Sequence, residues 1–145
     1  SYLARALAIK PDASAADFGV SEEVMEIACG DIMGMAGKAQ YAPGGRTEAM
    51  DEMFDPAGTD KSKNLCVIFG ILEDKIGDSG FFGSEAMVGD ACVAANVKLM
   101  LELQADCLEK FPKLAALVKT FDENEGVKKH AAHFPYPYFK RKSDE

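Results

Sequence analysis

Apolar residues recur every three or four positions along most of the chain, the spacing that gathers side chains on one face of an α-helix. The clearest stripe lies between Lys61 and Ile76 and consists of Leu65, Ile68, Phe69, Leu72 and Ile76. No stretch alternates with the period of two that is typical of a half-buried strand, and no segment repeats. The pattern therefore predicts an all-α helical bundle.

Turn residues divide this pattern into separate helices. We predict a long helix from Ser21 to Tyr41, in which Ser21 is the N-cap and acidic residues follow in the first turn. A linker over residues 10–19 precedes this helix, and the proline and two glycines of residues 42–45 end it. Further helices are predicted over residues 47–54, 61–76 with Asp60 as the cap, 90–103, 111–121 and 124–133.

The helix predicted over residues 90–103 is apolar on nearly all sides, because only Asn96 and Lys98 are strongly polar in its middle part. A helix of this kind is normally buried, so we expect it to be the central helix of the bundle. The loop before it, residues 77–84, is rich in turn residues but contains two adjacent phenylalanines. We therefore expect this loop to lie against the core.

Length and charge restrict the possible classes of protein. The chain has 145 residues, which suits one domain with a substantial core. A net charge of -8 and a pI near 4.8 make nucleic acid an unexpected partner, since the surface should repel phosphate groups. The basic cluster at residues 140–142 is interpreted as a solvated tail. Without a membrane-length apolar run or a leader, we expect a soluble, cytoplasmic protein.

The four cysteines are widely spaced, and each lies in an apolar or helix-like segment. They are Cys29, Cys66, Cys92 and Cys107. A disulfide framework or a zinc site would need closer spacing or histidine partners, so we expect free, buried thiols that pack as small hydrophobic groups. His130 and His133 are three residues apart on a predicted helix, but no third ligand lies near them in the sequence, so no metal site is predicted.

Four segments match one protein family in order and with compatible spacing. They are Ser1-Tyr2-Leu3-Ala4-Arg5, the helix over residues 26–41 with Asp31 and Tyr41 ten apart, Phe82-Gly83-Ser84 through Asp90, and residues 107–114, whose Phe-Pro-x-Leu begins a helix. In these segments the chain resembles the C-terminal helical domain of a cytosolic glutathione transferase, and the mu and sigma-like classes fit best. Together the segments span nearly the whole chain.

The resemblance implies that residues 1–10 are the end of the last helix of a thioredoxin-like domain plus a linker, and that residues 11–145 form a helical bundle around a buried central helix. In the family, the thioredoxin-like domain activates the thiol of glutathione, the co-substrate, and a hydrophobic electrophile lies over the helical domain of a homodimer. We therefore expect the electrophile-binding half of such an enzyme. The alternative is a non-catalytic, transferase-like interaction domain within a larger assembly.

Three glycines inside the long helix suggest where a ligand binds. Each costs about 0.5–1 kcal/mol relative to alanine, so some other role should justify them. The resemblance places this face of the helix at the hydrophobic substrate pocket; the alternative is that small residues let another helix pack closely. Aromatic residues of the tail would close the pocket, and the alternative for them is packing on the bundle. The candidate pocket residues are Gly30, Met33, Gly34, Gly37, Tyr41 and Phe134.

The resemblance also gives three residues individual roles. Asp31 aligns with an aspartate that reaches across the dimer to the glutathione amino group, and Tyr41 aligns with a tyrosine whose hydroxyl assists the electrophile; a solvated charge and an ordinary aromatic are the alternatives. Asp90 matches the acid of an N-cap box and is expected to be structural. Met87 stands where the family has Ser or Thr, so the cap oxygen is lost; the alternative is that Gly89 serves as the cap.

Overall fold

The computed structural model describes residues 13–133, with side chains through Lys129. Its elements are α2 (Ala15–Glu26), the π-helix η1 (Ile27–Ile32), α3 (Met33–Gln40), α4 (Arg46–Phe54), α5 (Leu65–Lys75), α6 (Val88–Leu103), α7 (Pro112–Asp122) and α8 (Glu125–His133). No strand occurs within these residues, which confirms the all-α prediction for this part of the chain. Residues 1–10, for which the resemblance implies the end of a helix plus a linker, lie outside the described residues.

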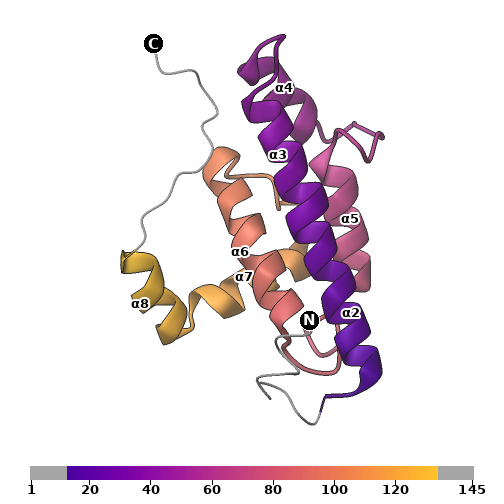
Figure 1. The fold of residues 1–145 in the computed structure, drawn as a ribbon, viewed down its shortest axis with the longest axis vertical. Coiled ribbons are helices and arrows are strands. Elements are labelled where there is room, and N and C mark those ends of the chain that lie inside the picture. The colour runs from indigo at the N-terminus through magenta and orange to yellow at the C-terminus, as the bar shows by residue number, and fades with distance from the viewer. Residues whose placement is uncertain (1–12, 134–145) are drawn as a thin grey trace.

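The first three elements form one long rod that runs along the bundle, drawn in indigo and purple (Figure 1). The rod begins at Ala15, because the extended Ser14 places its Oγ 3.0 Å from the Asp17 N–H and caps the helix. The prediction that Ser21 is the N-cap is therefore wrong, and part of the predicted linker is helical. Ser21 lies inside α2 and is buried.

The π-helical stretch lies in the middle of this rod. Val24, Ala28 and Ile32 are completely buried and are spaced four residues apart. An ideal α-helix turns once in 3.6 residues, so a strict four-residue spacing gradually leaves the buried face, whereas the wider i→i+5 turn of a π-helix suits it. The π-helix therefore keeps the buried side of α2 and the buried side of α3 turned toward the same core.

The short helix α4 and the amphipathic helix α5 occupy the predicted segments. The first turn of α5 is capped by Asn64, whose side chain also donates to two backbone carbonyls near the end of α4. The prediction of Asp60 as the cap is wrong, because its carboxylate accepts the N–H and the hydroxyl of Ser62 in a turn before the helix. The helix consequently starts at Leu65 rather than at Lys61.

Helix α6 contacts α2, η1 and α7, in keeping with the prediction of a central helix. Its buried residues are Gly89, Asp90, Val93, Ala94, Val97, Met100 and Leu103. Ala95, by contrast, is exposed, so within the described part of the protein α6 is buried along one side rather than all round. The loop before α6 lies against the core as predicted, since Phe82 is buried and Phe81 packs on the same cluster.

The last two helices lead away from the long rod. Helix α7 starts at Pro112, and its first turn is capped from α5, because the Glu73 carboxylate accepts the N–H groups of Lys113 (2.9 Å) and Leu114 (2.8 Å). Helix α8 packs against α7 and projects to the side of the bundle (Figure 1). Among the described residues, no helix combines the length and apolar character needed to cross a membrane.

Candidate functional site

The predicted pocket residues that the structure describes lie along one side of the rod formed by η1 and α3. Gly30 is exposed, and Met33, Gly34 and Gly37 are half-buried. A Cβ atom added to any of the three glycines would meet no other atom within 4 Å, apart from the neighbouring backbone of the same helix. Close packing against another described element is therefore not what these glycines provide. Phe134 lies outside the described residues.

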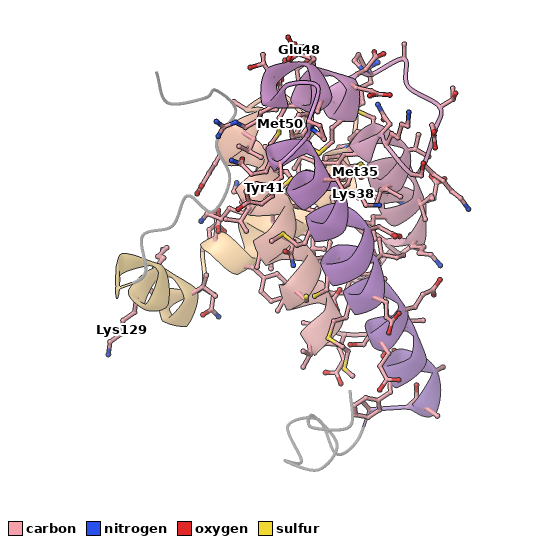
Figure 2. All side chains as sticks on the ribbon, turned by 45° about the horizontal axis from the view of Figure 1, so that its top comes forward. Met35, Lys38, Tyr41, Glu48, Met50 and Lys129 are labelled. Carbon is pink, nitrogen blue, oxygen red and sulfur yellow. The ribbon has the colours of Figure 1, made fainter. Side chains whose placement is uncertain are left out.

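Tyr41 ends this glycine face. Its side chain is 82% exposed, and Figure 2 shows it at the end of the molecule where α3 meets α4, which carries Glu48 and Met50. Asp31 is ten residues earlier and also exposed, so the two side chains start about 15 Å apart along the helix axis. Asp31 and Tyr41 of the same chain therefore do not meet at one site.

The glycine face is acidic at its Asp31 end. Gly30 and Asp31 line an open hollow together with three glutamates of α2, Glu22, Glu23 and Glu26. Of these, Glu23 is paired with Lys75 of α5 at 2.9 Å. A concentration of carboxylates raises the local concentration of cations and repels anions. This end of the face is therefore suited to a positively charged group.

The glycine that packing does require is Gly89, at the start of α6. An added Cβ would lie 2.7 Å from Val24 Cγ2 and 2.8 Å from Ser21 Cα, and closer still to the Ser21 carbonyl oxygen. The Gly89 N–H donates to Ser21 Oγ at 2.9 Å. Met87 is the N-cap, so the alternative of Gly89 as the cap is wrong, and the oxygen that Met87 lacks is supplied by Ser21 from another helix.

Asp90 joins the start of α6 to the loop that precedes it. One carboxylate oxygen accepts the Phe82 N–H and the other accepts the Met87 N–H, both at 2.9 Å. The side chain is buried, with 1% of the residue exposed, and this burial raises the pKa of Asp90 although its amide hydrogen bonds lower it. Asp90 therefore holds the backbone of the loop and of the helix start in place.

Two of the cysteines meet beside the glycine face. Cys29 of η1 and Cys92 of α6 have their sulfur atoms 3.4 Å apart. The prediction that every cysteine is buried is confirmed for Cys107 and wrong for Cys29, which is exposed. Cys66 and Cys92 are half-buried. Sequence reasoning missed the pair of Cys29 and Cys92, which is separated by 63 residues. A weak signal was present, because Asn96, one of the two strongly polar residues in the middle of this helix, lies one helical turn after Cys92.

A second hollow lies on another side of the bundle, between the end of α4, the start of α5 and residues 104–111. Its volume is about 310 Å³, and its apolar lining includes Phe54, Pro56, Val67 and Phe111, with Cys66 and Cys107 between them. Burial raises the pKa of both thiols, that of Cys107 to about 12, so both sulfurs are protonated at neutral pH. Protonated thiols are poor nucleophiles, so neither cysteine of this hollow is a reactive nucleophile at neutral pH.

Comparisons with known proteins give no match at a significant level, whether with protein-family models, curated proteins or solved structures. The resemblance to glutathione transferases therefore continues to rest on the four sequence segments. The side chains of His130 and His133 lie outside those described. Within the described part of the chain, no three His, Cys, Asp or Glu side chains are grouped to hold a metal ion.

Proposed function

We propose that this chain is the helical, electrophile-binding half of a glutathione transferase, and that the glycine face of η1 and α3 is its ligand surface. The observation that carries the proposal is the open space beside Gly30, Gly34 and Gly37, where an added Cβ would meet no other atom within 4 Å. Three helix-weakening glycines with no packing role among the described residues are expected where a ligand must approach the backbone closely.

The side chains along the glycine face suit the two ends of a glutathione conjugate. Met33 gives an apolar, adaptable surface for the electrophile, and the exposed Tyr41 hydroxyl is available to donate a hydrogen bond to it. At the other end, Asp31 and its neighbouring glutamates favour the ammonium group of glutathione. Because Asp31 and Tyr41 are far apart along one rod, we propose that Asp31 serves the site of a second copy in a homodimer.

The chemistry is divided between this chain and a thioredoxin-like domain. The thioredoxin-like domain lowers the pKa of the glutathione thiol, and the helical half holds the electrophile where the thiolate attacks it. Apart from Tyr41, whose hydroxyl assists the electrophile, the helical half contributes orientation and exclusion of water rather than a nucleophile. A cytoplasmic location, where glutathione is abundant and thiols stay reduced, belongs to the same proposal.

Alanine substitutions on the glycine face test the proposal, because they add volume without disturbing the described packing. Gly34→Ala and Gly37→Ala should each stabilise the protein by about 0.5–1 kcal/mol, since alanine favours a helix. The same variants should bind S-hexylglutathione several-fold more weakly in isothermal titration calorimetry. A variant that is more stable yet binds S-hexylglutathione less well would show that the glycine serves ligand binding rather than helix packing.

The matched control is Gly19→Ala. Gly19 lies on α2, and an added Cβ there also meets nothing within 4 Å, so stability should rise while binding stays unchanged. Conjugation of a chlorodinitrobenzene electrophile, measured with the chain joined to its thioredoxin-like domain, is the second test. The absence of both conjugation and binding to S-hexylglutathione would refute the enzyme proposal and favour the non-catalytic interaction domain.

A further inference from the structure

The sulfur atoms of Cys29 and Cys92 lie 3.4 Å apart, in van der Waals contact and not bonded. A disulfide bond is about 2.05 Å long, so the two sulfurs need to approach by only about 1.4 Å to form one. Cys29 is exposed, whereas Cys92 is half-buried on α6. The pair therefore combines a sulfur that small molecules can reach with a second sulfur held directly behind it.

We propose that Cys29 and Cys92 form a redox-active dithiol site, which a hydroperoxide converts into an intramolecular disulfide between η1 and α6. Cys29 is the attacking residue because it is the exposed member of the pair. Cys92 is the resolving residue, since burial and the adjacent Cys29 raise the pKa of Cys92 to about 11 and keep it protonated at neutral pH. This inference does not depend on the proposed function.

The reaction takes place in two steps. In the first, the Cys29 thiolate attacks one oxygen of the hydroperoxide; an S–O bond forms, the O–O bond breaks, and the leaving oxygen takes a proton. In the second, Cys92 sulfur attacks Cys29 sulfur; the S–S bond forms, the S–O bond breaks, and hydroxide leaves with the thiol proton as water. Two thiols are oxidised by two electrons in all, and one hydroperoxide is reduced.

Asn96 favours the second step. Its amide nitrogen lies 3.6 Å from Cys92 Sγ and donates to it, while the same amide is anchored at 2.9 Å on the Cys92 carbonyl oxygen. This hydrogen bond lowers the pKa of Cys92, opposing the effect of burial, and stabilises the negative charge that the sulfur gains as its proton leaves. Asn96 is thus a positioning residue for the resolving thiol.

The other two cysteines provide an internal comparison. Cys107 is buried, and Cys66 donates to the Phe54 carbonyl oxygen at 3.6 Å. Burial raises the pKa of both thiols, so a limited amount of peroxide should leave them reduced. Peroxide treatment should therefore remove two of the four free thiols, and both should belong to the pair of Cys29 and Cys92.

Peptide mapping of the unmutated protein tests the site directly. The reduced protein is treated with one equivalent of hydrogen peroxide, alkylated and digested with trypsin, which places Cys29 in residues 6–38 and Cys92 in residues 76–98. The two peptides should appear joined, lighter than their sum by two hydrogen atoms, and dithiothreitol should separate them. Sulfinic acid at Cys29 with Cys92 still alkylated would overturn the proposal, as would a link between Cys66 and Cys107.

Variants and isotope labelling complete the test. Cys29→Ser and Cys92→Ser should each abolish the cross-linked peptide, while Cys66→Ala should retain it. A mixture of ¹⁵N-labelled and unlabelled protein distinguishes links within a chain from links between chains, and mixed-label peptides as the main product would refute the intramolecular disulfide. Because the unmutated protein carries the peptide map, a serine variant that fails to fold leaves the test intact.

Discussion

Gly89→Ala should destabilise the protein by a large amount for the addition of one methyl group. The added Cβ would lie 2.7 Å from Val24 Cγ2 and 2.8 Å from Ser21 Cα, whereas ordinary carbon contacts begin near 3.5 Å, so α2 and α6 must separate by about 0.8 Å. Ser21 Cα is backbone and cannot rotate away. Overpacking of this kind costs about 1–3 kcal/mol, and lengthening the hydrogen bond from Gly89 N–H to Ser21 Oγ costs about 1 kcal/mol more.

Alanine regains up to about 1 kcal/mol of helix propensity, so the net loss should be about 2 kcal/mol, or roughly 6 °C in Tm for a domain of this size. Urea unfolding followed by circular dichroism measures the loss. Gly34→Ala is the matched control, because the same substitution in open space should stabilise the protein. If both variants were equally stable, the close crossing of α2 and α6 at Gly89 would be refuted.

Two further predictions concern carboxylates that hold helices in place. Burial raises the pKa of Asp90, so its contribution to stability is greatest below its unfolded pKa and is lost as pH rises; hydrogen bonds from Ser14 and the Ser84 N–H lower the pKa of Asp17, which has the opposite dependence. As pH falls from about 7 to about 3, the free energy of unfolding of the wild type should rise relative to that of Asp90→Asn and fall relative to that of Asp17→Asn, as measured in urea titrations. The same trend in both comparisons would contradict this reasoning. Glu73→Ala should cost about 1–2 kcal/mol by removing the cap of α7, whereas Asp74→Ala, an exposed neighbour, should change the unfolding midpoint little; equal effects would show that the cap is unimportant.

The positions of the helices could be predicted because the apolar periodicity reports directly which face of each helix is buried. Their starts were harder to predict, since local sequence offered more caps than the structure uses. Ser21 and Asp60 both carry suitable oxygens, but Ser14 and Asn64 cap the helices. Ser21 instead accepts a hydrogen bond from α6, a role that depends on how two helices cross and that no local pattern encodes.

The candidate site was predictable only in part. The glycines of the long helix could be recognised as unusual, because each costs helix stability wherever it stands. Whether open space or a neighbouring helix lies beside Gly34 depends on the tertiary arrangement, and so does the approach of Cys29 to Cys92 across 63 residues. The π-helix that contains Cys29 was also missed, because the four-residue apolar spacing around it is common in ordinary α-helices as well.

The caps of α6 and α7 come from residues distant in the chain, Ser21 and Glu73, and this has a consequence for the order of folding. In α6 the Asp90 side chain accepts the N–H of the cap residue Met87 but leaves that of Gly89 to Ser21, and α7 has no side-chain cap of its own, so each helix gains its full stability only after docking. As the chain leaves the ribosome, α2 and α5 emerge before the helices α6 and α7, whose N–H groups their side chains accept. We expect the second half of the bundle to assemble on the first as a template, in one cooperative event.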